Sequence, residues 1–512
     1  MIAPLAVWRA RWHDRRERER MLQDMRAPLA ALAGAAAIGA LIPSSPEAVL
    51  VVLAALAAGF VLLGWPDMCV PLVMFVIWSD AASVAIGSHG VPAVVGMGLP
   101  ALLVVPIAHR LVFQRDRLVF HPVLKWMVGY LGVLAVGTLF ARRIDLAQRE
   151  IVVFVTEGLL LVFLVTNAVR GPRVLRAATW GIVLGGMFLG LLSSFQQATG
   201  TFDNDYGGFA KVTAATFGTG EETLGTELRQ VRLGGPLGDQ NRYAQNELVV
   251  AFLALFLAWS ERRMPLRLLA LAGAGFSAAG AALTFSRGAA VSFVLALGVM
   301  VLLRYIQVRH LIVVVLGAGL LLAALPQFSQ RLLSLAVLTS AGDDDTAGLQ
   351  SADGATRGRL NEMISAAMAY GDHPIIGVGP GMFRLVFLDY AEDAGYKAQL
   401  KPREAHNLFL GIAADTGTLG LVTFGGVLAV TLAALHRERS RWLRRRPALA
   451  MLVAGYLMMV VAYLATGVFL HMAYERFYWC IIGMACAAAT VAAREAEIEA
   501  DRGRDGAGLP AG

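Results

Sequence analysis

The sequence predicts an all-α protein that crosses a membrane many times. Of its 512 residues, 57% are hydrophobic and only 16% are charged, and the mean hydropathy is +0.62. Soluble domains carry about 25% charged residues. The apolar residues fall in runs of about 17–25, the length that a helix needs to cross a hydrocarbon core of about 30 Å. We therefore expect the chain to lie in a bilayer, with its function carried by the polar segments between the spans.

Fourteen apolar runs follow one another along the chain. The Ala-rich first run and the Pro-containing fourth run are weak, so we expect twelve to fourteen transmembrane helices. The expected spans are 28–43, 46–64, 69–86, 91–112, 122–141, 151–169, 177–195, 244–260, 267–284, 289–304, 310–326, 408–435, 448–468 and 474–491.

Basic connections predict the orientation, because short loops rich in Lys and Arg stay in the cytoplasm. The N-terminal arm 1–27 carries seven arginines and the loop 436–447 carries six. Counting spans from a cytoplasmic arm places both of these segments and the C-terminal tail inside. The loop 142–150, with three arginines, then lies outside, which indicates either an error in this topology or an anion site.

The spans and loops divide the chain into seven parts. They are the basic cytoplasmic arm 1–27, N-terminal transmembrane helices 28–195, an outer loop 196–243, central transmembrane helices 244–326, a large outer catalytic loop 327–407, C-terminal transmembrane helices 408–491 and a cytoplasmic tail 492–512. The large loop combines a helical pattern over 358–370 with turn residues from Asp372 to Gly381. It is therefore expected to fold as a small cap on the outer face.

Composition and spacing argue against several other functions. The net charge of +7 lies mostly in the segments that set the topology, so no nucleic-acid partner is expected. The three cysteines lie in or beside apolar spans without metal-ligand spacing, which argues against a disulfide scaffold or a zinc site. The glycines of 377–381 follow no strand, which argues against nucleotide binding. The two halves show no repeat, which argues against an internally duplicated transporter.

The most informative polar segment runs from Arg403 to Gly411, at the end of the large loop. It places His406 beside arginines at a membrane surface, where a neutral imidazole can take a proton from a sugar hydroxyl. The alternative is that His406 caps the helix that follows. Asn407 suits either orienting a substrate or capping that helix.

Several arginines are expected on the same outer face, whereas lysines are few in the two outer loops. Because arginine keeps its charge and forks onto phosphate oxygens, the group indicates an anionic substrate. Any one of them alone could instead extend to lipid headgroups. The candidates are Arg242, Arg287, Arg357, Arg359 and Arg403.

Two acidic residues, Asp80 and Glu157, stand out inside the expected spans. A charge buried in a membrane is costly and needs a partner or a function. These two could pair with outer arginines, line a water-filled cavity or move protons. Glu475 and Arg476, near the start of the last span, are a second candidate pair.

Taken in order, these segments resemble the O-antigen ligase and O-antigen polymerase superfamily of bacterial envelope glycosyltransferases, over roughly residues 230–480. The likeness lies in Gly235-Pro236 through Asn241-Arg242, in Thr284 to Ala289 around Arg287, in His373-Pro374 followed by Gly377 and Gly379, in His406-Asn407 followed by Gly417, and in Glu475-Arg476-Phe477. In the ligase pattern a Thr stands where this chain has Gly420, which favours a polymerase.

The resemblance implies a GT-C-like enzyme of the bacterial inner membrane, with both termini cytoplasmic and the active site on the periplasmic face. Such enzymes move a glycan from undecaprenyl pyrophosphate to a hydroxyl, with inversion and without a metal or cofactor. The acceptor is another lipid-linked glycan in an O-antigen or exopolysaccharide polymerase, and a lipid A core or a protein in a ligase. A lipid-linked glycan flippase and a non-catalytic scaffold are the alternatives from other classes.

The resemblance also implies roles for individual residues. His406 would be the base that activates the acceptor hydroxyl. Arg287, Arg242 and one of Arg357 or Arg359 would hold the pyrophosphate, and Arg403 is a further candidate for either task. The supporting residues would be Asn241, Asn407, Glu475 and Arg476.

Overall fold

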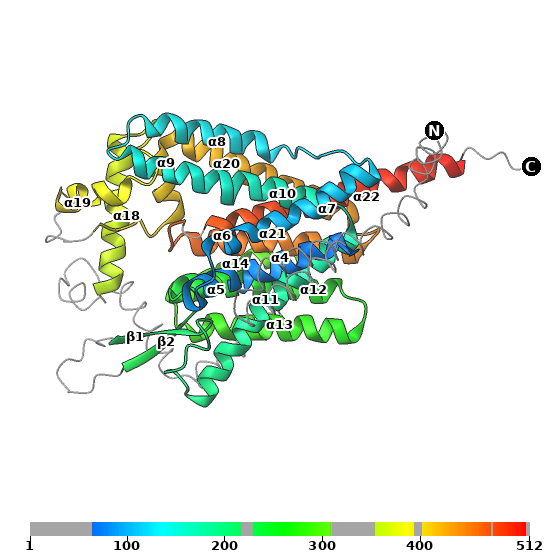
Figure 1. The fold of residues 1–512 in the computed structure, drawn as a ribbon, viewed down its shortest axis with the longest axis horizontal. Coiled ribbons are helices and arrows are strands. Elements are labelled where there is room, and N and C mark those ends of the chain that lie inside the picture. The colour runs from blue at the N-terminus through cyan, green and yellow to red at the C-terminus, as the bar shows by residue number, and fades with distance from the viewer. Residues whose placement is uncertain are drawn as a thin grey trace, which may run out of the picture.

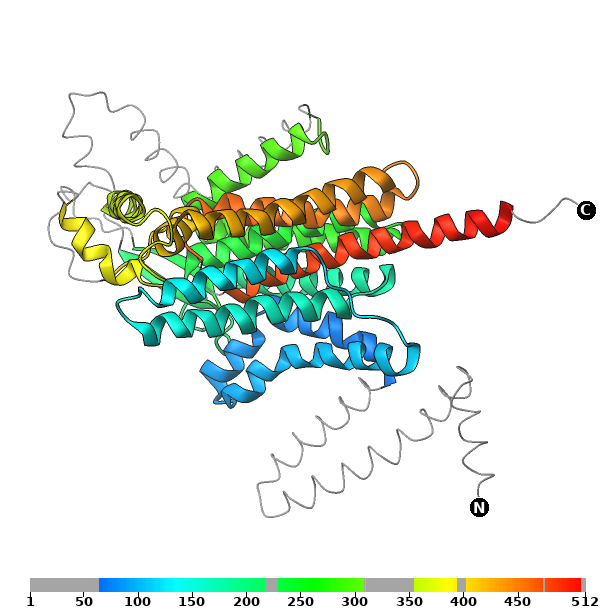
Figure 2. The ribbon, with the colours of Figure 1, turned by 90° about the horizontal axis from the view of Figure 1, so that it is seen from above.

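The computed structural model describes residues 64–216, 229–307, 309, 354–393, 402–472 and 475–507. These residues form a bundle of helices that run mostly along one common direction (Figures 1 and 2). Seven of the helices are long and apolar enough to cross a membrane, and an eighth span is added if a bent helix pair counts as one. The prediction of an all-α, multi-pass membrane protein is therefore confirmed.

The elements follow one another with short connections in most of the described chain. They are η1 (Pro66–Met68), α4 (Cys69–Trp78), α5 (Ala81–His89), α6 (Ala93–Gly98), η2 (Leu99–Leu103), α7 (Val104–His109), η3 (Arg110–Gln114), α8 (Val123–Thr138), α9 (Ile144–Val153), η4 (Phe154–Leu160), α10 (Leu161–Ala168), α11 (Pro172–Thr199), β1 (Lys211–Thr216), β2 (Arg229–Gly235), α12 (Gln240–Ser260), α13 (Met264–Leu283), α14 (Arg287–Leu302), α18 (Gly354–Asp372), α19 (Phe383–Asp393), α20 (Leu408–Trp442), α21 (Pro447–Gly467) and α22 (Glu475–Ala507).

Eleven of the fourteen expected spans fall on described residues, and each coincides with helical structure. The expected spans 28–43, 46–64 and 310–326 lie outside the described residues, apart from position 64. Three expected spans appear as shorter apolar helices, at Leu99–Gln114, Val123–Thr138 and Arg287–Leu302. The expected span 69–86 is bent by 59° between α4 and α5, because Asp80 at the break adopts a left-handed conformation with φ of 54°.

Small residues let the helices of the core approach closely. A Cβ added at Gly181 of α11 would overlap the backbone carbonyl of Pro71 in α4. On the same helix, a Cβ at Gly190 would overlap the backbone of Phe276 in α13. Glycines at such contacts are typical of helices that pack in a bilayer, where van der Waals contact must replace the hydrophobic effect.

One end of the bundle carries two helices of the large loop, α18 and α19, and we refer to it as the cap end (Figure 1). These helices share a small core of their own, which includes Ala366, Phe383 and Phe387 and also contacts Ala405 and Ala414. The helix expected over 358–370 is thus present as α18. The described part of the loop 196–243 also holds a hairpin that the sequence analysis did not anticipate, in which β1 pairs antiparallel with β2 from Lys211 opposite Gly235 to Thr216 opposite Arg229.

Candidate functional site

The candidate residues gather at the cap end, where four long helices begin (Figure 1). The helices α12, α14, α20 and α22 start there at Gln240, Arg287, Leu408 and Glu475. A helix N-terminus carries the equivalent of about half a positive charge. The four helix starts therefore place backbone N–H donors at the cap end, where α8, α11, α13 and α21 also end.

The connection between α21 and α22 ties these helix starts together. Gln245 Nε2 donates to Thr466 Oγ1 at 2.7 Å, and Asn407 Nδ2 donates to the carbonyl oxygen of Val468 at 3.0 Å. Phe469 packs against Gly288, where an added Cβ would lie 3.1 Å from the Phe469 Cβ. The end of α21 and the connection that follows it thus contact α12, α14 and α20 near their starts.

His406 lies directly before α20, with its side chain 29% exposed. Its backbone has a φ of 45°, which is uncommon for a residue with a side chain. Nδ1 lies 2.7 Å from Oε2 of Glu362 and 3.2 Å from the carbonyl oxygen of Glu404. The carbonyl oxygen of Glu404 can only accept, so Nδ1 carries the hydrogen and Nε2 keeps the lone pair, while the Glu362 carboxylate adds a close contact without hydrogen-bond geometry. The imidazole is therefore held in the tautomer that a general base needs at Nε2.

Glu362 is a site residue that the sequence analysis missed. It lies on α18 with its side chain only 1% exposed, and its Oε1 accepts from Arg403 Nη1 at 2.9 Å. One buried carboxylate therefore contacts two predicted candidates, His406 and Arg403. The only signal in the sequence was a glutamate inside the helical pattern of 358–370.

Asn407 is the N-cap residue of α20. Its Oδ1 accepts from the backbone N–H groups of Phe409 and Leu410 at 2.9 and 3.0 Å. The capping alternative weighed for this residue is therefore the one that the structure displays. The cap also fixes the backbone directly after His406.

Arg242 lies in the first turn of α12 and is only 3% exposed. Asp239 caps this turn by accepting from the backbone N–H groups of Asn241 and Arg242.

Burial lowers the pKa of His471 to about 2, and the charges of Arg242 and His406 act in the same direction. His471 packs edge-on against His406 with ring centroids 5.4 Å apart, so a neutral imidazole lies beside the candidate base.

Asn241 connects the hairpin to the turn before α14. Ser286 Oγ donates to Asn241 Oδ1 at 2.9 Å, and Arg232 Nε donates to the carbonyl oxygen of Thr284 at 2.8 Å. Ser286 also caps α14 by accepting from the N–H of Ala289. Arg359 lines a small pocket together with Asn241 and Ser286. The structure therefore brings Arg359 of the large loop to the two motifs around Asn241 and Arg287.

The structure also shows where the remaining predicted arginines lie. Arg287 is the first residue of α14 and is half-buried. Arg357 lies on α18, but its side chain is outside the described residues. Arg403 is 45% exposed beside Glu362 and lines an open pocket with Arg384 and His406.

The turn 373–381 packs into a break in α20. Gly417 has φ of 64° and ψ of −162°, and a Cβ there would overlap the backbone of Ile375. The turn replaces helical hydrogen bonds, because Val378 N donates to Ala414 O at 2.8 Å and Thr418 N donates to Pro374 O at 2.8 Å. The glycines of this turn thus dock the cap on α20, and Gly417 allows the turn and the helix to pack closely.

A cavity of about 410 Å³ adjoins His406 on the side of α8, η4 and α22. Five carboxylates but only two arginines line it, together with aromatic side chains that include Tyr130 and Trp479. Among the described residues, no group of three or more His, Cys, Asp or Glu side chains is arranged to hold a metal ion. The cavity shares Arg384 and Glu404 with the open pocket of His406. Burial raises the pKa of Glu404, and Arg384 opposes this effect.

The acids predicted to be buried meet near the start of α22. Arg476 Nη2 donates to Asp80 Oδ1 at 2.7 Å and to Ser83 Oγ at 3.0 Å, and its backbone N–H donates to Glu157 Oε2 at 3.1 Å. Glu475 accepts from Trp479 Nε1 at 3.0 Å. Asp80 therefore follows the pairing alternative, whereas Glu157 accepts from a backbone N–H and, like Glu475, lines the acidic cavity.

Two of the arginines in the loop 142–150 are paired locally. Arg142 contacts Asp389 of α19 at 2.8 Å, and Arg143 contacts Asp145 at 2.8 Å. Both pairs are more than half exposed, so neither is expected to contribute much to stability. The first pair links this loop to the cap.

A comparison with curated proteins finds no match for this chain. A comparison with protein families gives one match, to the O-antigen ligase family, over residues 272–425. The matched segment contains Arg287, α18, the turn 373–381, His406 and the break at Gly417. Together with the membrane-spanning fold, this match supports an envelope glycan function and suggests glycosyltransferase activity. The match agrees with the resemblance to the O-antigen ligase and O-antigen polymerase superfamily and covers about a third of the chain.

Proposed function

We propose that this protein transfers a glycan from undecaprenyl pyrophosphate to an acceptor hydroxyl at the outer face of the bacterial inner membrane. The observation that carries the proposal is the hydrogen bond of His406 Nδ1 to the carbonyl oxygen of Glu404, beside the buried carboxylate of Glu362, which leaves Nε2 as the proton acceptor. The site lies between a group of arginines and an acidic cavity. The proposed orientation has both termini in the cytoplasm and the cap end outside.

The proposed reaction is a single displacement. His406 Nε2 takes the proton of the acceptor hydroxyl while its oxygen bonds to the anomeric carbon of the donor sugar. The bond from that carbon to the pyrophosphate oxygen breaks, and the pyrophosphate leaves with the electron pair. Because attack comes from the face opposite the leaving group, the product has the inverted configuration. Charge grows on the leaving oxygen, so preorganised cations lower the barrier.

The distribution of charge supports a place for each substrate. Arg242, Arg287 and Arg359 lie on α12, α14 and α18, Arg403 contacts Glu362 of α18, and their guanidinium groups suit the pyrophosphate. The cavity on the other side is lined by five carboxylates and two arginines, so it offers the pyrophosphate fewer cationic partners. Carboxylates accept hydrogen bonds from sugar hydroxyls, and aromatic rings offer apolar faces to a sugar. We assign the acceptor sugar to this cavity.

The acceptor class is proposed to be another lipid-linked glycan, which makes the protein an O-antigen or exopolysaccharide polymerase. Support comes from Gly420, which stands where the ligase pattern has Thr. A side chain at 420 would overlap Thr416, whose hydroxyl donates to the carbonyl oxygen of Ile412 at 2.6 Å. The alternative acceptor is a lipid A core or protein hydroxyl, which would make it a ligase.

The test is the lipid-linked and surface glycan profile of a deletion strain that carries wild type, His406→Ala or His436→Ala. His436 is an exposed histidine near the other end of α20 and serves as the matched control. We expect single repeat units to accumulate on the carrier in the deletion and His406→Ala strains, and a normal profile with His436→Ala.

Each other outcome has a defined meaning. Full-length polymer on the carrier with an unmodified core identifies a ligase. Lipid-linked units held at the cytoplasmic face indicate a flippase. A normal profile with His406→Ala contradicts the catalytic role of this histidine and returns the scaffold alternative.

A further inference from the structure

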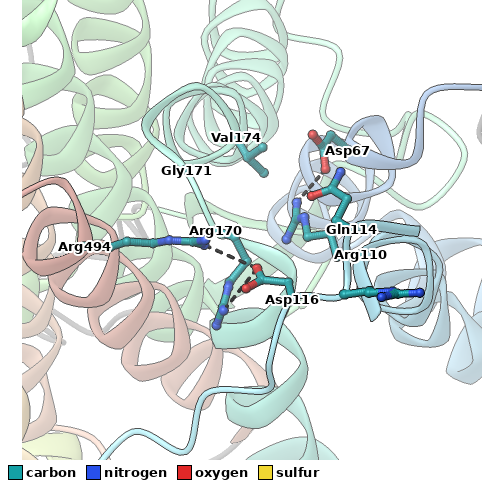
Figure 3. A pocket seen from close by; sticks show the side chains of 9 residues that line it. Asp67, Arg110, Gln114, Asp116, Arg170, Gly171, Val174 and Arg494 are labelled. Atoms are coloured by element: carbon teal, nitrogen blue, oxygen red, sulfur yellow. Dashed lines mark hydrogen bonds and ion pairs between the residues drawn. The ribbon is translucent and has the colours of Figure 1, made fainter. Parts of the chain in front are cut away.

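A second polar pocket lies at the end of the bundle opposite the cap (Figure 1), and Figure 3 shows it from close by. Its volume is about 410 Å³, and it is built from the end of α7, η3, the connection before α11 and α22. The residues that line it are Asp67, Arg110, Gln114, Arg115, Asp116, Arg170, Gly171, Val174 and Arg494. Neither the proposed reaction nor the family match, which covers 272–425, assigns a role to these residues.

The pocket and the candidate active site lie at the two ends of the same helix. Glu475 lines the acidic cavity and Arg494 lines this pocket, 19 positions further along α22. At 1.5 Å per residue this separation is about 28 Å, close to the thickness of a hydrocarbon core. The pocket therefore lies at the membrane surface opposite the proposed active site.

Arg110 forms the fixed wall of the pocket. Its Nη1 donates to the carbonyl oxygens of Ala168 and Asn167 at 2.6 and 3.2 Å, and its Nη2 donates to Asp67 at 2.5 Å. These carbonyls belong to the last turn of α10, where the helix leaves acceptors unpaired. Arg110 is thus engaged in holding the end of α10.

Arg170 has a buried N–H donor group that is not used within the described part of the chain. Its side chain is only 9% exposed, and its Nη2 donates to Asp116 Oδ2 at 3.2 Å and to the carbonyl oxygen of Arg117 at 2.9 Å. Its Nη1 is buried and has no hydrogen-bond partner within the described part of the chain. Arg494 reaches the same oxygen of Asp116 from α22, at 3.3 Å (Figure 3). Two guanidinium groups therefore share one carboxylate, and one of them keeps an unused donor in a buried place, which is unfavourable unless a ligand accepts from it.

The start of α11 adds backbone donors to the same pocket. Gly171 is its N-cap and provides no side-chain cap, and Pro172 has no N–H. The first helical hydrogen bond runs from Leu175 N to Gly171 O, so the N–H of Val174 precedes it. A helix N-terminus of this kind binds anions. Since four arginines and two aspartates line the pocket, two positive charges remain in excess.

We propose that this pocket binds a phosphate group at the membrane surface opposite the active site. The excess of two positive charges matches a phosphate monoester dianion, and the unused Arg170 donor and the start of α11 supply directional hydrogen bonds. The phosphate comes either from the headgroup of an anionic phospholipid or from a soluble phosphate. The pocket would thereby fix the bundle at this surface while glycan transfer takes place at the other.

The test measures binding by the full-length protein in nanodiscs of phosphatidylcholine. One arm adds phosphatidic acid to the disc and quantifies retained lipid by native mass spectrometry, and the other adds inorganic phosphate to lipid-only and protein-loaded discs. The variants are Arg170→Gln, which removes the unused donor, and Arg494→Gln, which is 43% exposed and tests the site with less risk to folding. Arg445→Gln is the control, because Arg445 is an exposed arginine in the loop that follows α20.

We expect Arg170→Gln and Arg494→Gln to weaken binding of phosphatidic acid by about tenfold each, the effect of 1.4 kcal/mol, while Arg445→Gln leaves it unchanged. Retention of phosphatidic acid without competition by inorganic phosphate assigns the source to the lipid. Binding of inorganic phosphate that is lost in the same two variants assigns it to a soluble ligand. Equal binding by wild type, Arg494→Gln and Arg445→Gln in both arms overturns the proposal.

Discussion

Glu362 Oε2 lies 2.7 Å from His406 Nδ1, although the two residues are 44 positions apart in the sequence of the large loop. Glu362 is buried on α18, whereas His406 is partly exposed directly before α20. The large loop therefore does more than cover the end of the bundle. It supplies a buried carboxylate that directly contacts the imidazole of the candidate base.

This relationship predicts the effect of Glu362→Gln. The Glu362 carboxylate stabilises the imidazolium that forms as His406 takes the proton, and losing a contact with a charged group costs about 1.5–3 kcal/mol, or about ten- to a hundredfold in rate. Glutamine keeps an amide oxygen that can still accept from Arg403, so we expect kcat to fall while KM for the lipid-linked donor stays near wild type. The measurement is steady-state transfer by the purified protein with lipid-linked donor.

A double variant separates positioning from mere folding. If Glu362 acts only through His406, adding Glu362→Gln to His406→Ala changes the residual rate little, because the two effects are not additive. Full additivity of the two losses would show that Glu362 acts independently of the histidine.

Much of the fold could be predicted from the sequence because its signal is local. Each run of apolar residues is itself long enough to define a helix, and all eleven runs on described residues are helical. The bend at Asp80 and the hairpin were missed, since both depend on backbone conformation and pairing beyond the apolar pattern. The arginine candidates came from their residue type. Glu362 and His471 could not be found in this way, because their contacts with His406 arise only when the loop and the α21–α22 connection meet.

His471 predicts a pH dependence of stability. Its pKa in the folded protein is lowered to about 2 by burial and by the charges of Arg242 and His406, whereas an unfolded histidine titrates near 6.5. Between these values the unfolded chain binds the additional proton. The contribution of neutral His471 to the free energy of unfolding is therefore fully present above about pH 6.5 and falls by roughly 1 kcal/mol per pH unit below it.

The check is the thermal midpoint of detergent-solubilised protein from pH 7.5 to pH 5. His471→Gln should lose less stability over this range than wild type, although it is less stable at pH 7.5. His436→Ala, with an exposed histidine, should follow the wild-type curve. Parallel curves for wild type and His471→Gln would show that His471 does not resist protonation.

Two substitutions of Asn407 should separate its role as the cap of α20 from its hydrogen bond to Val468. Its Oδ1 caps α20, while its Nδ2 holds Val468 at 3.0 Å. Asn407→Ala removes both and should cost about 1 kcal/mol or more. Asn407→Asp keeps the cap but loses the donor to Val468, so it should retain most of the stability and still lower transfer by disturbing the connection that carries His471. The thermal midpoints and transfer rates of Asn407→Ala and Asn407→Asp are compared. Equal stability of the two variants would mean that the cap does not stabilise the start of α20.

Gly417 makes the sharpest prediction about how the cap is attached. Its φ of 64° and the overlap of an added Cβ with Ile375 leave no room for alanine, because the turn 373–381 presses its backbone against the break in α20. Strain of this kind costs about 1–3 kcal/mol, and displacement of the turn adds to it by removing the bonds from Val378 and Thr418. Gly417→Ala should therefore lower the thermal midpoint and, since α18 carries Glu362, abolish most transfer.

The matched control lies on the same helix, at Gly425. An added Cβ there meets nothing within 4 Å, so Gly425→Ala should be neutral or stabilise the helix by up to about 1 kcal/mol. Limited proteolysis of the loop 373–381 distinguishes the two variants, because a detached cap exposes this turn to cleavage. Wild-type resistance to proteolysis in Gly417→Ala, together with wild-type transfer, would mean that the cap holds Glu362 against His406 without the break in α20.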